Sequence, residues 1–94
     1  MSDVQVTKNE QAGRYEAHID GELAGFAEYE RSEGVVEFPH TVTEPEFGGR
    51  GVASALARTS LDEARAEGLQ VIPSCSFYAG WISKHPEYAD LVRS

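Results

Sequence analysis

The feature that most constrains this chain is a glycine-rich turn that leads directly into a helical segment. The residues from Gly48 to Gly51 read Gly-Gly-Arg-Gly, and from Val52 onward apolar residues recur at the spacing of an amphipathic helix. The first turn of a helix leaves backbone N–H groups without partners and carries partial positive charge. Glycine at the entry permits a positive φ and lets an anion approach the bare backbone. The pattern therefore predicts a site for a phosphate or diphosphate group.

Length and composition indicate one folded domain spanning residues 1–94. Of the 94 residues, 40% are hydrophobic and 10% aromatic, values that favour a globule over a disordered segment. There is no apolar run of about 18 residues and no signal-peptide pattern at the N-terminus, so we expect no membrane contact. Cys75 is the single cysteine and cannot form an internal disulfide, which fits a cytoplasmic location.

The net charge is −8, from sixteen acidic and eight basic residues. This balance disfavours nucleic acids and anionic membranes as partners. It does not exclude a phosphate ligand, because charges farther than about 8 Å are screened at physiological salt and close donors dominate.

Alternating apolar and polar residues predict four strands before the glycine turn, at 4–8, 14–19, 23–29 and 35–42. Asp20-Gly21 is a strong two-residue hairpin signal between the second and third of them. Pro39 lacks an N–H donor and therefore marks an edge, a bulge or a break in pairing.

After the turn the period changes to about 3.6 residues, which predicts a helix from Val52 that ends at Gly68. A short strand at 69–73 and helices beginning near Cys75 and Pro86 complete the chain. A helix between the fourth and fifth strands is a right-handed crossover, which makes that pair parallel. We therefore predict an α+β fold with a mixed, mainly antiparallel five-stranded sheet, a crossover helix and C-terminal helices.

Three phosphate-binding motifs compete for the glycine turn. The dinucleotide fingerprint requires a third glycine where Ser54 stands, and the P-loop requires a Gly-Lys-Ser/Thr ending that is absent. The coenzyme A loop, Arg/Gln-x-x-Gly-x-Gly/Ala, is matched by Gly51 and Ala53, with Gly48 where Arg or Gln is typical. A plain strand-to-helix turn without a ligand is the alternative interpretation.

Further ordered blocks agree with the coenzyme A loop: 40–56, 63–69, 72–77 and 84–92. On these residues the chain resembles the small single-domain Gcn5-related N-acetyltransferases, which lack the N-terminal helices of full-length relatives. The resemblance covers Val35 to Val92 well and the N-terminal hairpins loosely. It implies a minimal version of that fold, with the sheet splayed between its fourth and fifth strands.

The resemblance also implies acetyl-coenzyme A as cosubstrate, with direct transfer of the acetyl group to a small-molecule or protein amine in a ternary complex. The pantetheine arm is expected in the splay and the diphosphate on the glycine turn. The coenzyme-binding residues expected from the resemblance are Thr41, Val42, Gly48, Gly49, Arg50, Gly51, Val52, Ala53 and Ser54.

Three residues are candidates for the chemistry. His40 can act as the general base, since histidine exchanges protons near neutral pH, or can be structural; Glu37 acting through a water is a weaker alternative. Cys75 precedes a predicted helix, where a thiol becomes more nucleophilic, but a buried free cysteine is the common alternative. Tyr78 is a candidate acid for the coenzyme thiolate, or a packing residue. The histidines and the cysteine lack metal-ligand spacing, so no metal is expected.

Two other functions remain open at this stage. The chain can be a coenzyme-binding module without turnover, or a structural or protein-interaction domain that binds no coenzyme. The acidic composition favours a cationic acceptor, whereas the sequence leaves the oligomeric state undetermined.

Overall fold

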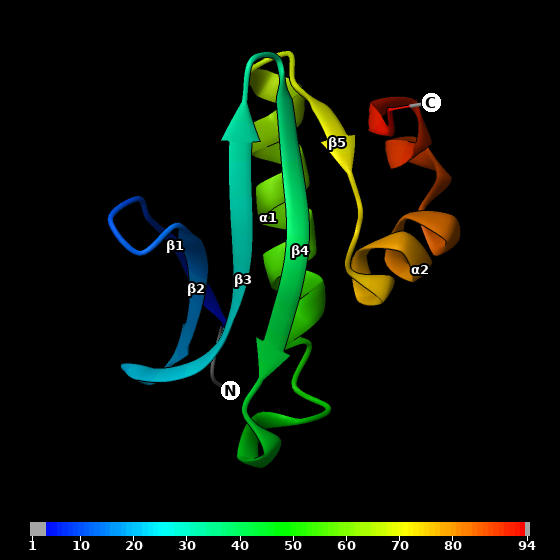
Figure 1. Cartoon of the computed structure of the whole chain (residues 1–94). Coiled ribbons are helices and arrows are strands. Elements are labelled where there is room, and N and C mark those ends of the chain that lie inside the picture. Colours follow the sequence, from blue (N-terminus) through cyan, green and yellow to red (C-terminus); the bar gives the residue numbers. More distant parts are fainter. Residues whose placement is uncertain (1–3, 94) are drawn as a thin grey trace.

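The strands lie in the sheet in the order in which they occur in the chain. The computed structural model describes residues 4–93, and the sheet order is β1-β2-β3-β4-β5. The elements are β1 (Gln5–Asn9), β2 (Arg14–Ile19), β3 (Glu22–Ser32), β4 (Val35–Thr43), the 3₁₀ helix η1 (Pro45–Phe47), α1 (Val52–Ala66), β5 (Gln70–Ile72), α2 (Ser76–Lys84) and the 3₁₀ helix η2 (Pro86–Leu91). The first three strand pairs are antiparallel, and β4 and β5 are parallel because α1 crosses between them (Figure 1). The predicted α+β fold and its crossover helix are confirmed.

Turn chemistry explains why the first strands form hairpins. Asp20 and Gly21 have φ values of 52° and 81°, the two consecutive positive angles that a tight β2–β3 connection requires. The bounds of β2 are as predicted, and those of the other strands differ from the predicted ones by at most three residues at either end. The 3₁₀ helix η1 is an addition that the sequence did not predict.

A β-bulge changes the faces of β4 halfway along the strand. Glu28 of β3 lies opposite His40, whereas Glu30 lies opposite Glu37, so Phe38 and Pro39 together oppose one residue of β3. Pro39 thus stands at a bulge, one of the three outcomes expected from its missing N–H. Because of the extra residue, side chains beyond the bulge have the opposite alternation from those before it.

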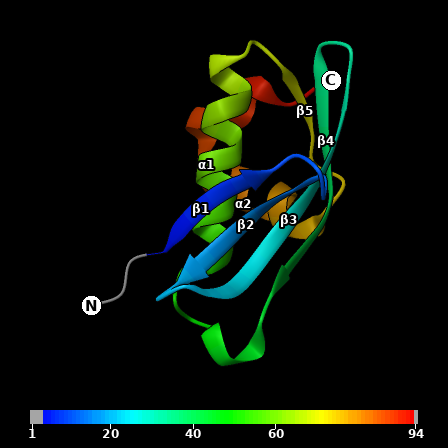
Figure 2. The ribbon, with the colours of Figure 1, turned by 90° about the vertical axis from the view of Figure 1, so that its left-hand side faces the viewer.

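One face of α1 forms the core with the sheet. Its buried residues recur at helical spacing, as the sequence predicts: Val52, Leu56, Ala57, Ser60, Leu61 and Ala64. The helix lies behind β3 and β4 in Figure 1, and Figure 2 shows it from the side, packed along the sheet. Within the described residues, no helix covers the face of the sheet that points toward the viewer in Figure 1. No described helix has the length and apolar character needed to cross a bilayer.

The C-terminal segment packs against α1. The Tyr88 hydroxyl donates to Asp62 Oδ1 at 2.6 Å, and Arg65 holds both carboxylate oxygens of Asp90 at 3.0 Å. Trp81 is buried between these elements, with 5% of its surface exposed. The two polar contacts fix η2 beside the last turns of α1.

Candidate functional site

The turn between η1 and α1 presents backbone N–H groups that have no partner within residues 4–93. Gly49 and Gly51 have φ values of 79° and 76°, a region that favours glycine. Among the described residues, no side chain caps α1 at Gly51, and the first amide of the helix with a bonded partner is that of Ala55, which donates to the Gly51 carbonyl at 3.0 Å. The unpartnered amides are those of Gly49, Gly51, Val52, Ala53 and Ser54. Together with the dipole of α1, these donors can bind an anion.

The start of α1 is held close to the sheet at Gly25. A Cβ at this position would lie 2.5 Å from the carbonyl oxygen of Val42 and 2.8 Å from Cγ1 of Val52. Only a glycine permits this approach of β3, β4 and α1. The contact sets the position of the anion-binding turn, and sequence reasoning did not single out Gly25.

The strands β4 and β5 separate after three residue pairs, Val35–Glu37 with Gln70–Ile72. Beyond them, the Cys75 N–H donates to the Phe38 carbonyl at 2.9 Å, while β4 continues to Thr43. Figure 1 shows the chain after β5 moving away from β4 and into α2. This divergence is the splay that the family resemblance implies.

Cys75 lies in this splay, at the N-terminus of α2. Its Sγ is 3.4 Å from Oγ1 of Thr41, and the side chain is half-buried. Burial alone would raise the pKa of the thiol. Hydrogen bonds from the Thr41 hydroxyl and from the backbone of Tyr78 and Phe77 outweigh burial, and the pKa of Cys75 is lowered. The structure thus brings together two of the predicted site residues, Thr41 and Cys75.

Tyr78 belongs to the core and not to an open site surface. Its side chain is fully buried, its ring stacks on Phe38 at a centroid distance of 4.5 Å, and its Oη is 2.7 Å from Oγ of Ser60. Burial raises the pKa of Tyr78, and the bond to Ser60 only partly opposes this. This placement suits a packing role better than the proton donation expected from the sequence, because the hydroxyl is already engaged inside the protein.

His40 lies on the opposite face of β4 from Thr41. It is exposed, its ring is 6.3 Å from that of Phe26, and it stands opposite Glu28. Within residues 4–93 it makes no hydrogen bond to Cys75. The bulge at Pro39 accounts for this orientation, since it shifts the alternation of β4 just before His40.

A groove of about 380 Å³ runs between the first turn of α1 and one face of α2. Its lining residues are Ser54, Ser76, Phe77, Gly80, Trp81, Lys84 and His85. Trp81 Nε1 donates to Ser54 Oγ at 3.3 Å, which joins the two helices at the groove. Except for Ser54, none of these residues was predicted as a site residue. The residues contributed by α2 are spaced by three to four positions, which places them on one helical face. This spacing is the sequence signal that could have indicated a shared surface.

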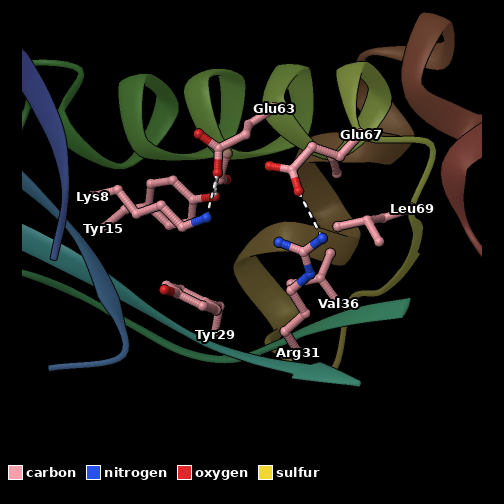
Figure 3. Close-up of a pocket in the computed structure, with 10 residues that line it drawn as sticks. Lys8, Tyr15, Tyr29, Arg31, Val36, Glu63, Glu67 and Leu69 are labelled. Atoms are coloured by element: carbon pink, nitrogen blue, oxygen red, sulfur yellow. Dashed lines mark hydrogen bonds and ion pairs between the residues drawn. The ribbon is translucent and has the colours of Figure 1, made fainter. Parts of the chain in front are cut away.

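A smaller cavity lies at the other end of the core, between β1–β3 and the second half of α1 (Figure 3). Glu63 accepts hydrogen bonds from Lys8 Nζ at 2.7 Å and from Tyr15 Oη at 2.6 Å, and Arg31 pairs with Glu67 at 2.7 Å. Burial opposes ionisation of Glu63, but the bonds from Lys8 and Tyr15 outweigh it and lower its pKa. Because these charges are compensated, the cluster serves to tie the sheet to α1.

Comparison with known proteins agrees with this geometry. The model of a family described as GCN5-related N-acetyl-transferase matches residues 14–91. Among solved structures, the chain is similar to the NMR solution structure of a GCN5-like protein from Staphylococcus aureus, with a TM-score of 0.75 and 24% sequence identity over 100% of this chain and 92% of that chain. At this identity the likeness establishes the fold. No curated protein sequence matches the chain.

Proposed function

Because the chain belongs to the GCN5-related N-acetyltransferase family, we propose that it binds acetyl-coenzyme A and transfers the acetyl group directly to an amine in a ternary complex. The observation that carries the proposal is that one groove extends from the anion-binding turn to the splay where the Cys75 thiol lies. The groove touches the first turn of α1 at Ser54 and reaches Ser76, the neighbour of Cys75. Donors for a diphosphate therefore lie at one part of the groove and Cys75 beside another, which suits a long ligand that is anionic at one end.

Each part of the site has a proposed role in binding. The amides from Gly49 to Ser54 hold the diphosphate, and the exposed Arg50 adds positive charge. On the side of β4 that faces β5, no strand of the described chain pairs with Thr41 and Val42, so their backbone groups are proposed to bind the pantetheine arm. When bound, the coenzyme supplies an acetyl thioester.

The amine is proposed to approach from the uncovered face of the sheet, where His40 is exposed and can accept a proton. On the other side of β4, the donors that lower the pKa of Cys75 are the Thr41 hydroxyl and the backbone at the start of α2. They converge on one point of the splay. These same donors can stabilise negative charge on a sulfur held there. In this mechanism Cys75 is a neighbour of the reacting centre, and acetylation of its sulfur is the competing route. Tyr78 is structural.

A second candidate function is coenzyme binding without turnover. It is favoured by the separation of the catalytic candidates, since neither the His40 side chain nor the Tyr78 hydroxyl forms a hydrogen bond to the Cys75 thiol among the described residues. Under either function we propose a cytoplasmic location, where reducing conditions keep Cys75 as a free thiol.

Calorimetric titration with acetyl-coenzyme A is the first test, and we expect saturable binding with a dissociation constant below about 1 mM. A thiol-release assay with a panel of amines then separates enzyme from binding module. Binding without thiol release for any amine supports the second candidate, and absence of binding contradicts both.

Variants then test the proposed mechanism. His40→Gln should lower turnover by about 10²-fold, whereas His18→Gln, on β2, should not. Cys75→Ser should retain turnover if transfer is direct and abolish it if the acetyl group passes through Cys75. Equal losses in the two histidine variants would contradict the role of His40.

A further inference from the structure

The uncovered face of the sheet carries a carboxylate next to the exposed imidazole of His40. Glu28 of β3 stands directly opposite His40 of β4 in the antiparallel ladder. Ala27 and Tyr29, the neighbours of Glu28 along β3, pack on the core side of the sheet. Glu28 therefore points to the other face, where His40 is exposed. Directly opposite residues have Cβ atoms about 4.5–5.5 Å apart, so both side chains can contact one small molecule.

The protein does not neutralise the charge of Glu28. The side chain is exposed, and its carboxylate forms no ion pair or hydrogen bond within residues 4–93. Arg14 lies opposite Glu28 on β2, but its guanidinium is engaged elsewhere. Arg14 Nε donates to Glu16 at 2.8 Å, and the guanidinium lies 4.4 Å from the centre of the Phe26 ring. The carboxylate of Glu28 can therefore pair with a cation from solution.

The sheet order determines which part of an acceptor Glu28 can reach. β3 and β5 lie on opposite sides of β4 (Figure 1), so Glu28 is on the far side of His40 from the splay. The thioester is proposed to lie in the splay, and the reacting nitrogen must lie between it and His40. Glu28 is one strand farther away, and one strand spacing plus the reach of the side chain gives roughly 5–8 Å. This distance suits a second cationic group of the acceptor.

We propose that Glu28 is a specificity-determining residue that selects acceptors with a second ammonium group about 5–8 Å from the reacting amine. The inference rests on the proposed function, because it takes His40 to face that amine. The second ammonium donates a charge-assisted hydrogen bond to Glu28. In the transfer step, the neutral nitrogen forms a bond to the acetyl carbon and the carbon–sulfur bond breaks. The sulfur leaves with the electron pair, and the proton lost by the nitrogen passes to His40.

Amide NMR of the full chain with coenzyme A present tests the proposal without requiring turnover. The chain is titrated with 1,4-diaminobutane, which has this spacing when extended, and with n-butylamine, which has the same carbon chain and one nitrogen. We expect saturable shifts at Glu28 and His40 and about tenfold tighter binding of the diamine, an effect typical of one good ion pair. Glu28→Gln should abolish this preference, and Glu28→Asp, which keeps the charge, should retain part of it.

Glu33→Gln is the matched control for the change in net charge. Glu33 is exposed in the β3–β4 turn, forms no ion pair within residues 4–93 and lies at the end of the hairpin away from His40. This variant should leave the preference for the diamine intact. In the thiol-release assay, Glu28→Gln should lower kcat/KM for the diamine about tenfold, mainly through KM, and leave the value for n-butylamine unchanged within about twofold.

Three results would overturn the proposal. They are a wild type that binds the diamine no more tightly than n-butylamine, a Glu28→Gln variant that still prefers the diamine, and an equal loss of preference in Glu33→Gln. Failure of the proposed function looks different. Tighter binding of the diamine at Glu28, with no thiol release from acetyl-coenzyme A for any amine, would contradict acetyl transfer and leave the role of Glu28 in place.

Discussion

Replacement of Gly51 by alanine separates the stability of the fold from anion binding. Gly51 has φ 76° and ψ 19°, and no heavy atom lies within 4 Å of an added Cβ. The cost is therefore conformational and amounts to about 1–2 kcal/mol, the penalty of a left-handed conformation for a residue with a Cβ. In a domain of this size, thermal denaturation should show a decrease in Tm of roughly 5–15 °C.

Gly34→Ala is the matched control. Gly34 lies in the β3–β4 turn with φ 73°, also with open space around an added Cβ. Both variants should therefore lose similar stability. Only Gly51→Ala adds a methyl group among the unpartnered amides at the start of α1, and it should weaken coenzyme A binding at least about tenfold, or about 1.4 kcal/mol, by calorimetry.

Two results would refute this reasoning. Unchanged coenzyme affinity in Gly51→Ala, together with the expected loss of Tm, would mean that the turn is not the anion site. An equal loss of affinity in Gly34→Ala would mean that affinity follows overall stability and reports nothing about the turn.

Three further predictions follow from the geometry. Gly25→Ala forces a Cβ to within 2.5 Å of the Val42 carbonyl oxygen, so it should destabilise the fold by about 2–3 kcal/mol in urea denaturation, and a loss under about 0.5 kcal/mol would contradict the close contact. Thr41→Val removes a hydrogen bond that lowers the Cys75 pKa, so the pH profile of thiol alkylation should move to higher pH, with Thr41→Ser restoring it; an unmoved profile in Thr41→Val would show that the bond is unimportant. Because the folded state lowers the pKa of Glu63, its contribution is complete at neutral pH and is lost as the pH falls below the ordinary value of 4.5 toward the folded-state pKa. Glu63→Gln should therefore cost about 1 kcal/mol at pH 7, reduced by the 35% exposure of the side chain, and progressively less at acid pH; a pH-independent difference would contradict the ionic account.

The fold was largely predictable because its signals are local. Alternation predicted the strands, Asp20-Gly21 predicted the first tight hairpin, and the change of period predicted α1. Gly68, with φ 70°, follows the last turn of α1 as its position in the pattern indicated. Each of these signals depends on residues within a few positions of one another.

The candidate site was less predictable because it depends on packing between distant segments. The groove exists because α2 packs beside α1, a contact made by Trp81 and Ser54 across 27 positions of the sequence. Trp81 is buried, yet it also lines the groove. The burial of Tyr78 on Phe38 could not be derived from the sequence pattern, because an exposed and a buried tyrosine fit the same helical position.

The bulge in β4 shows how one residue limits sequence reasoning. Pro39 allowed an edge, a bulge or a break, and only the register with β3 decides among them. The register therefore determines which of His40 and Thr41 lies on which face of the sheet. The residues proposed for proton transfer and for the thiol environment therefore lie on opposite sides of β4, which alternation alone did not reveal.

Amide NMR during a coenzyme A titration tests the central claim most directly, since that claim concerns the backbone N–H groups from Gly49 to Ser54. The account predicts that the amide signals of Gly49, Gly51, Val52, Ala53 and Ser54 shift together, saturably and by more than those of the β3–β4 turn. If coenzyme A binds while these five signals stay in place, the anion is held elsewhere and the account is contradicted.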